Sequence, residues 1–398
     1  MTSKIVNSLL DKIQSSAIVG SPLRTINSLG SHPLAYRTFG GQPQANETLD
    51  ETVMETAFGS HYLLTMLASG SIIRNVLYPE SESDHTLYCD GWIYKFLDNH
   101  GLLEHGVWDL VEHQTLDANI TMENIDHRIY YSASKPYALL DAAKRSTADG
   151  LSILFVDTDL ILKKRHDAIL KHPKTIRAAY GHLEALCLPC YSDFKTLHFP
   201  DGYHLPEEIP TDLPAVNTCL MYFNDMELLS DWCKFFASLF QNNWLTQEPD
   251  ADTISQQLLG FDQRTFPMVA ATHNLWGTEQ LEAFLNLNWD PPFFYDNATG
   301  QKAEWHYYTL EDHPEHPDWL QDIMHTWINK RNIERDIPYR NYQGCMMLEI
   351  LLELEDGIEP YLRSFQSLQP YFELLKNHGT IENMLSMGAV RNRLDKTK

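Results

Sequence analysis

The sequence contains few cysteines and no long apolar run. Its six cysteines are scattered over 398 residues, which argues against a disulfide framework and suits a reducing compartment. No stretch of about eighteen apolar residues occurs, so no membrane-spanning helix is expected. The first residues also lack the apolar segment of a secretory signal. We therefore expect a soluble, cytoplasmic protein.

Basic residues are also scarce. Thirty Lys and Arg stand against 54 Asp and Glu, which gives a formal net charge of −24 at pH 7. Such a charge argues against nucleic acid or an anionic membrane as a partner, because both are themselves negative. Hydrophobic residues at 43% and charged residues at 21% are typical of a globular protein with a sizeable core.

The sequence divides into three regions that differ in composition and in hydrophobic pattern. Residues 1–50 are rich in Gly, Ser, Pro, Asn and Thr after a loosely helical start, and they predict an N-terminal extension. Strand-like and helix-like segments alternate within 51–317, which predicts one α/β domain with a mostly parallel sheet and crossover helices. Apolar helical patterns in 318–398 predict a helical C-terminal subdomain. The predicted strands are 52–58, 85–90, 107–111, 215–224 and, within the apolar run 152–162, a strand that ends in Asp157-Thr-Asp159. The predicted helices include 61–76, 91–99, 135–144, 226–240, 248–270, 319–329, 345–354, 361–375 and 381–387.

The most informative stretch is the apolar run of residues 152–162, which only Asp157, Thr158 and Asp159 interrupt. It predicts a buried strand whose carboxyl end carries two acids, and in an open α/β sheet ligands bind at that end. The alternation of a strand puts Asp157 and Asp159 on the same face, where two carboxylates repel each other unless a cation lies between them. A hard divalent metal is the natural candidate.

Two chemistries fit this pair of acids. The carboxylates can hold a metal ion that binds the diphosphate of a nucleotide. Alternatively, Asp157 can attack a phosphoryl group while Asp159 serves as acid and base. The pair itself is compatible with both.

The order of segments around the pair resembles the GT-A glycosyltransferases over roughly residues 52–310. Those enzymes have a Rossmann-type domain with an Asp-x-Asp metal motif. The matching features here are Lys135 at the start of the preceding helix, Asp157-Thr-Asp159, residues 217–224, and Asp262-Gln263. The resemblance implies a GT-A-like α/β fold and metal-dependent transfer of a sugar from a nucleotide-diphosphate sugar to an acceptor hydroxyl.

The same resemblance implies roles for individual residues. Thr56, Ala57 and Phe58 are similar to the loop that cradles the nucleoside, and Lys135 matches a basic residue near the donor phosphates or sugar. The family's Asn-x-Gly strand corresponds to Asn217, although Thr218-Cys219 replaces the usual small-Gly step. The implied donor-binding set is Thr56, Ala57, Phe58, Lys135, Asp157, Asn217 and Gln263, and the implied catalytic residues are Asp262, as a base toward the acceptor, and Lys135.

The implied metal is Mn²⁺ or Mg²⁺, held by Asp157, Asp159 and a histidine. His306 is the first candidate for that third ligand, followed by His273 and His313. An imidazole among carboxylates suits manganese better than magnesium.

Other hypotheses stay open. The segment Phe155–Asp159 is also similar to the opening of haloacid-dehalogenase-like phosphatases, with Asp157 as nucleophile, but Leu160-Ile161 stands where that family has Gly-Thr. A non-catalytic nucleotide-sugar-binding protein is a third possibility, since a fold does not imply turnover. If the protein is a transferase, we expect a UDP- or GDP-sugar donor, and the acceptor is a saccharide, a protein or a small molecule.

Overall fold

The computed structural model describes twelve stretches of the chain. They are residues 23–30, 49–77, 85–120, 133–158, 160–162, 175–181, 183, 210, 213–241, 251–284, 323–325 and 337–378.

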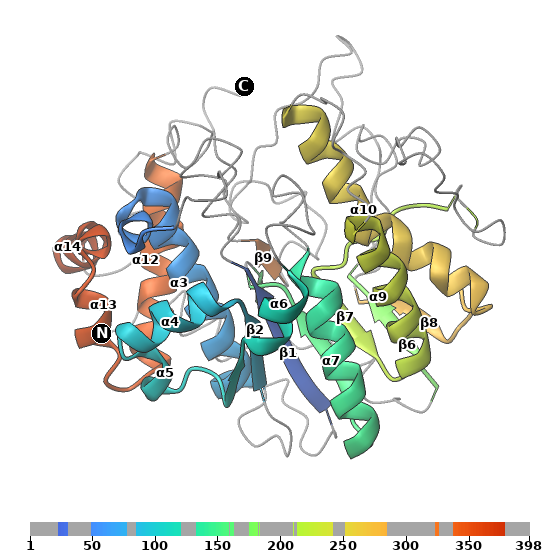
Figure 1. Ribbon diagram of the computed structural model, residues 1–398. Coiled ribbons are helices and arrows are strands. Elements are labelled where there is room, and N and C mark those ends of the chain that lie inside the picture. Colours follow the sequence, from blue (N-terminus) through green and yellow to red (C-terminus); the bar gives the residue numbers. More distant parts are fainter. Residues whose placement is uncertain are drawn as a thin grey trace, which may run out of the picture.

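A seven-stranded sheet lies at the centre of this part of the chain (Figure 1). The strand order is β3-β2-β1-β4-β7-β6-β8. Its members are β1 (Leu23–Leu29), β2 (His85–Cys89), β3 (Leu110–Glu112), β4 (Ser152–Val156), β6 (Ala178–Tyr180), β7 (Leu220–Phe223) and β8 (Leu281–Ala283).

Most of the strand pairings are parallel. β1 pairs in parallel with both β2 and β4, β2 does so with β3, and β6 with β8. Only β7 runs antiparallel to its neighbours, β4 and β6. The predicted α/β class with a mostly parallel sheet is therefore confirmed.

The predicted strand at residues 52–58 is wrong. Those residues form a 3-10 helix, η1 (Glu51–Glu55), and the start of α3 (Ala57–Ile72). Capping explains the difference, because the Asp50 side chain accepts a hydrogen bond from the Thr52 amide and the Thr56 hydroxyl accepts one from the Gly59 amide. Two consecutive N-caps satisfy the free amides of helix starts, and this local chemistry outweighs the apolar alternation.

The first strand of the sheet comes from the predicted extension instead. β1 lies between β2 and β4, with Ile26 paired to Thr86 on one side and to Phe155 on the other. Both of its edges are therefore hydrogen-bonded. The region 1–50 thus supplies a central strand of the sheet.

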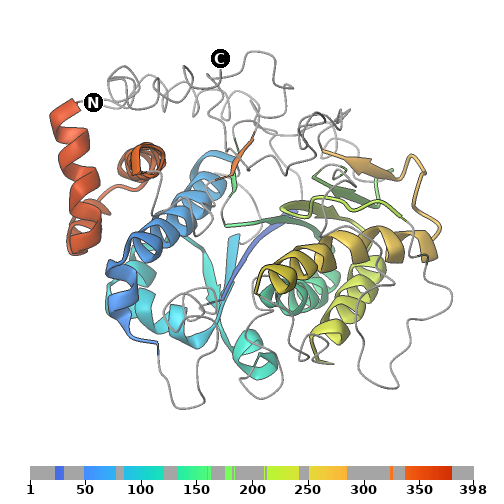
Figure 2. The ribbon, with the colours of Figure 1, turned by 90° about the horizontal axis from the view of Figure 1, so that it is seen from above.

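Helices cover both faces of the sheet (Figure 2). Along β4, Leu154 and Val156 belong to the core that contains α3, whereas Ile153 and Phe155 belong to the core that contains α7 and α9. This division follows the alternation of side chains along a strand. The helices between the strands are η2 (Ile73–Leu77), α4 (Gly91–Asn99), α5 (Leu102–His105), α6 (Gln114–Asn119), α7 (Ser134–Asp149), α9 (Met226–Gln241) and α10 (Ala251–Thr272).

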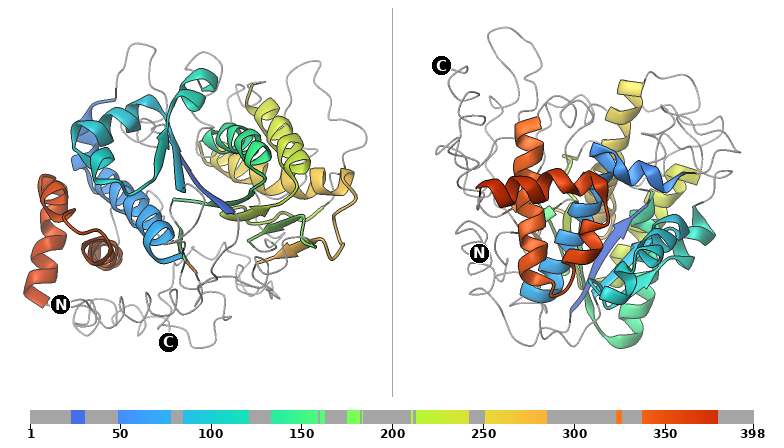
Figure 3. Two further views of the ribbon diagram at one scale, coloured as in Figure 1. Left: turned by 90° about the horizontal axis from the view of Figure 1, so that it is seen from below. Right: turned by 90° about the vertical axis from the view of Figure 1, so that its left-hand side faces the viewer.

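C-terminal helices pack beside α3, on the side away from α7 and α9 (Figure 3). They are α12 (Ile337–Leu354), α13 (Glu359–Arg363), η8 (Gln366–Leu368) and α14 (Gln369–His378). Their apolar side chains, among them Met347 and Phe372, share a core with α3. The predicted helical character of this region is borne out in these stretches.

One predicted C-terminal helix is contradicted. Residues 319–329 include a short strand, β9 (Ile323–His325), which pairs antiparallel with β5 (Leu160–Leu162) in a second, two-stranded sheet. An isolated helix of this length is marginal in water. Pairing with β5, which follows Asp159 in the sequence, gives the backbone of β9 inter-strand hydrogen bonds instead. The predicted helix at 381–387 lies outside the described residues.

None of the described helices combines the length and the apolar character required to cross a membrane.

Candidate functional site

Asp157 follows β4 at the carboxyl end of the sheet, and its backbone is held on two sides. Its amide donates to the Cys219 carbonyl at 2.8 Å, which ties it to the chain just before β7. Its carbonyl accepts from the Ser69 hydroxyl of α3 at 3.4 Å. The side chain remains 28% exposed, so Asp157 has a fixed backbone and a carboxylate that solvent can reach.

The neighbouring strand contributes a buried amide to this edge. The Asn27 side chain in β1 donates to the Val156 carbonyl at 2.6 Å, and its oxygen accepts from the Trp108 indole at 3.4 Å. These bonds link β1, β4 and the segment before β3. They hold the end of β4, and with it Asp157, in register.

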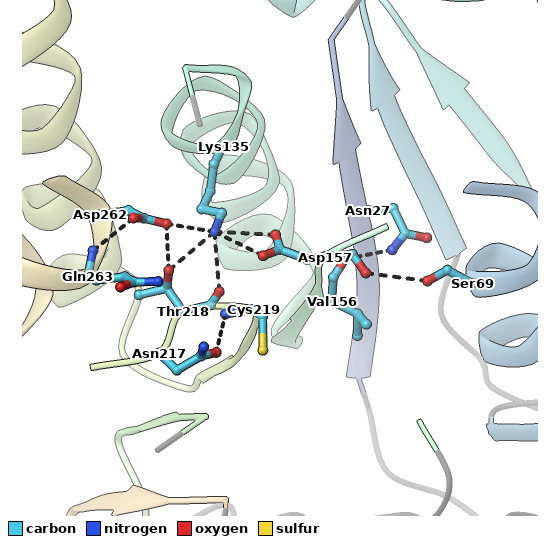
Figure 4. Close-up of polar contacts among 10 residues, drawn as sticks. All are labelled: Asn27, Ser69, Lys135, Val156, Asp157, Asn217, Thr218, Cys219, Asp262 and Gln263. Carbon is cyan, nitrogen blue, oxygen red and sulfur yellow. Dashed lines mark hydrogen bonds and ion pairs between the residues drawn. The ribbon is translucent and has the colours of Figure 1, made fainter. Parts of the chain in front are cut away.

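Lys135 lies in the first turn of α7 and points at the carboxyl end of β4 (Figure 4). Its ammonium nitrogen is 2.9 Å from Asp262 Oδ2 and 3.3 Å from Asp157 Oδ1. The residue is only 5% exposed. A buried ammonium needs such partners, because burial without them would cost several kcal/mol.

Thr218 completes the group of polar side chains around Lys135. Its hydroxyl donates to Asp262 Oδ2 at 2.5 Å, and both its hydroxyl and carbonyl oxygens are 3.3 Å from the Lys135 nitrogen. Asp262 Oδ1 accepts from the Gln263 amide at 2.9 Å. Both carboxylate oxygens of Asp262 therefore have hydrogen-bond donors.

A proline inside α10 positions this part of the site. Pro267 has no amide hydrogen, so the carbonyl of Gln263, four residues earlier, lacks its usual helical donor. The Val216 amide donates to that carbonyl at 2.9 Å. This bond anchors the segment before β7 to α10 and brings Thr218 against Asp262.

The two carboxylates determine the charge of Lys135. Burial by itself would lower the pKa of the Lys135 ammonium, but attraction by Asp157 and Asp262 outweighs it and raises the pKa. Lys135 is therefore a permanent cation near neutral pH. With two carboxylates around one ammonium, this group carries a net charge of about −1.

Asn217 lies beside the group without contacting Lys135. Its side-chain oxygen accepts from the Cys219 amide at 3.0 Å, and its carbonyl accepts from the Gly181 amide at 2.9 Å. A Cβ on Gly181 would lie 3.0 Å from both Asn217 oxygens, so a residue without a side chain allows this close approach. Asn217 thus shapes the turn that presents Thr218.

Thr56, Ala57 and Phe58 are far from this group. They begin α3, whereas Ser69, which contacts Asp157, lies near the other end of that 16-residue helix. At 1.5 Å per residue, the separation along the axis from Thr56 to Ser69 is about 20 Å. The strand on which their nucleoside role was predicted is a helix, so the structure does not bring them to Asp157.

Only part of the predicted metal set can be placed. Asp159, His306 and His313 lie outside the described residues. His273 is at the end of α10, where its Nε2 is 3.1 Å from Asp231 Oδ2, on α9. In the part of the chain that the structure describes, no cluster of three or more His, Cys, Asp or Glu side chains is arranged to hold a metal.

Asp157 itself has the chemistry that a hard divalent cation requires. It offers carboxylate oxygens, it is partly exposed, and the group around it retains a net negative charge. Of the predicted donor set, Asp157 is the described carboxylate whose chemistry is compatible with such an ion.

Sequence reasoning missed the role of Thr218, which it noted only as a departure from the family pattern. A second missed feature is the bond between Val216 and Gln263. The signal for the latter was present, because a proline in the polar helix predicted over 248–270 leaves a carbonyl in need of a donor.

No family model matches the sequence, and no curated protein matches it. Among solved structures, mouse xyloside xylosyltransferase 1 is 11% identical with a TM-score of 0.35, over 67% of this chain and 86% of that one. The glycosyltransferase GlyE of Streptococcus pneumoniae TIGR4 is 11% identical with a TM-score of 0.35, over 89% and 64%. The galactosyltransferase LgtC, in complex with donor and acceptor sugar analogs, is 12% identical with a TM-score of 0.27, over 59% and 70%. All three are glycosyltransferases, but likeness at this level carries no conclusion about activity.

Proposed function

We propose that this chain is a metal-dependent glycosyltransferase that moves a sugar from a nucleotide-diphosphate sugar to an acceptor hydroxyl. The observation that supports this most is the meeting of Asp157, Lys135 and Asp262 at the carboxyl end of β4. A partly exposed carboxylate beside a permanent, buried cation suits a ligand that carries phosphate groups and brings a divalent ion.

In this proposal each residue has a distinct task. Asp157 holds Mn²⁺ or Mg²⁺ together with Asp159 and His306, and when bound the ion supplies positive charge to the departing diphosphate. Lys135 adds a fixed positive charge at the same place, where negative charge develops in the transition state.

Asp262 holds Lys135 in this scheme. It is 6% exposed and both its oxygens already accept hydrogen bonds, so a role as base toward the acceptor would require it to give up the Lys135 ion pair. We therefore assign Asp262 the role of positioning Lys135. The neighbouring Gln263 keeps its assigned contact with the donor sugar.

A hydrolysis screen tests this function. Wild-type protein is incubated with UDP-, GDP- and CMP-sugars and Mn²⁺, and release of the nucleotide is measured. We expect slow release from one UDP- or GDP-sugar, loss of it with a chelator, and a decrease of about 100-fold in Asp157→Asn. The matched control is Asp98→Asn, which removes the same charge from an exposed position on α4 and should leave the rate unchanged.

Two outcomes would contradict the proposal. Full activity in Asp157→Asn would separate the activity from this site. Metal-dependent release of phosphate from an aryl phosphate, with no action on any nucleotide sugar, would instead support the phosphatase hypothesis with Asp157 as nucleophile.

A further inference from the structure

The Lys135 ammonium lies at different distances from its two carboxylate partners, Asp157 and Asp262. Its nitrogen is 2.9 Å from Asp262 Oδ2, but 3.3 and 3.5 Å from the two oxygens of Asp157. The Asp262 side is reinforced by Thr218, whose hydroxyl bonds the same carboxylate oxygen and whose carbonyl also faces the ammonium. Of the two carboxylates, Asp157 therefore lies farther from the Lys135 ammonium.

The two carboxylates also differ in solvent exposure, and Asp157 is the more exposed. The side chain of Asp157 is 28% exposed, whereas those of Asp262 and Lys135 are 9% and 7% exposed. On the buried side, the Lys135 nitrogen also lies 5.0 Å from the centre of the Phe155 ring, a favourable cation–π contact. An ion from solvent can thus reach Asp157, while Asp262 stays shielded behind the ammonium.

These two facts make Lys135 and a divalent ion competitors for the oxygens of Asp157. Two cations within a few ångströms repel each other, and each binds a carboxylate better when the other is absent. If Asp157 turns to a bound ion, Lys135 loses its more distant carboxylate partner and keeps Asp262 and Thr218. It stays paired, and an N–H that had pointed at Asp157 becomes available at the exposed edge.

We propose that Lys135 is the resident counter-ion of Asp157, that a divalent cation displaces it from this carboxylate, and that the N–H so released binds a diphosphate oxygen of the donor. This inference rests on the proposed function, because it takes Asp157 as a metal ligand. It adds a coupling between metal and nucleotide that passes through a side chain of the protein.

The first arm of the test measures Mn²⁺ binding by titration calorimetry without nucleotide. The key variant is the double substitution Lys135→Met with Asp262→Asn, which removes the buried pair as a whole and so avoids leaving Asp262 as an unpaired buried charge. We expect it to bind Mn²⁺ roughly tenfold more tightly than wild type, because the competing cation is gone. Asp157→Asn should lose this binding, and Lys144→Met, on the exposed face of the same helix, should bind as wild type does.

The second arm measures binding of UDP and GDP at saturating Mn²⁺. The double variant should bind the nucleotide roughly tenfold more weakly than wild type, because it lacks the N–H that reaches the diphosphate. The two arms thus change in opposite directions. Structural damage at the site would weaken metal and nucleotide together, so it predicts a different pattern.

The failures of the two proposals are distinguishable. If Asp157→Asn binds Mn²⁺ as wild type does, Asp157 is not a metal ligand, and the metal dependence in the proposed function falls together with this inference. If Asp157→Asn loses the ion but the double variant gains no affinity for it, the metal site stands and the counter-ion role of Lys135 is wrong. Unchanged nucleotide affinity in the double variant overturns the transfer of the N–H to the diphosphate.

Discussion

At the scale of single residues, the site is built from buried charges that satisfy one another. Lys135 and Asp262 are both almost fully buried, and each would be costly alone. The Thr218 hydroxyl links them at short range. The group is thus sensitive to any substitution that removes one partner.

Thr218→Val should lower the free energy of unfolding by about 1–3 kcal/mol. Valine keeps the shape of the side chain but removes the hydroxyl that donates to Asp262, and a lost buried hydrogen bond to a charged group costs this much. Urea unfolding measures the change. Thr218→Ser, which keeps the hydroxyl, is the control, and equal losses in the two variants would contradict a role for the hydroxyl.

His85 should make the fold sensitive to acid. Burial lowers the pKa of its imidazole from 6.5 to about 4, although Asp109 opposes the shift. Its Nδ1 is 2.9 Å from the Thr25 hydroxyl, and its Nε2 has no hydrogen-bond partner among the described residues. A proton on the ring therefore adds a buried charge without a new acceptor.

The direction of this pH dependence follows from the number of protons bound in the folded and unfolded states. Between about pH 6.5 and 4 the unfolded chain protonates His85 and the folded protein does not, so stability is full above this window and falls as the pH decreases through it. The loss amounts to about 3 kcal/mol. In urea unfolding measured from pH 7 to 4, the free energy of unfolding should decrease less for His85→Gln than for wild type. The same pH dependence in both proteins would refute this role of His85.

At the scale of elements, the proline inside α10 allows a hydrogen bond between this helix and the segment before β7. The carbonyl of Gln263 cannot bond to Pro267 and instead accepts from Val216, just before β7. The missing amide of Pro267 therefore leaves the Gln263 carbonyl open to Val216, and this bond helps to place Thr218 at the site. Without this contact, nothing in the local sequence would direct Thr218 toward Asp262.

Pro267→Ala tests this connection. Replacing a proline inside a helix ordinarily stabilises the helix by about 3 kcal/mol. Here we expect a much smaller gain in the free energy of unfolding, because the restored amide competes with Val216 for a carbonyl that is already bonded. We also expect weaker nucleotide binding, since the anchor of Thr218 is loosened. A gain of the full amount with unchanged nucleotide affinity would be the contrary result.

At the scale of the whole molecule, the sheet draws its strands from distant parts of the chain. β1 comes from the region predicted as an extension, yet it joins β2 to β4. The helices α12 and α14 come from the C-terminal region and share the core of α3. Segments on both sides of the predicted boundary at residue 50 therefore belong to one sheet.

Removal of residues 1–30 should abolish folding. The deletion takes away β1, with the buried side chains Leu23 and Ile26 on its two faces, and leaves two unpaired strand edges, β2 and β4. Circular dichroism and urea titration should give no cooperative unfolding transition for the shortened chain. A cooperative transition like that of the full chain would mean that β1 is dispensable.

The sequence by itself determined the features that depend on local patterns. The bounds of β2 and α9 were predicted to within one residue, as were the starts of β4 and of α7. Periodicity and apolar run length report these directly. Asp157 was identified from its place at the end of a buried apolar run, whereas Lys135 and Asp262 were implied by the resemblance of the surrounding segments to the GT-A glycosyltransferases.

Only the tertiary structure decided which of those residues meet. Lys135 and Asp262 are 127 positions apart, and their contact depends on an antiparallel β7, a proline in α10 and the central place of β1. The strand predicted over residues 52–58 was wrong because two N-caps favour helix in a segment with a strand-like pattern. Pairing between distant strands, and contacts across the core, depend on the free energy of the whole fold, which no window of neighbouring residues contains.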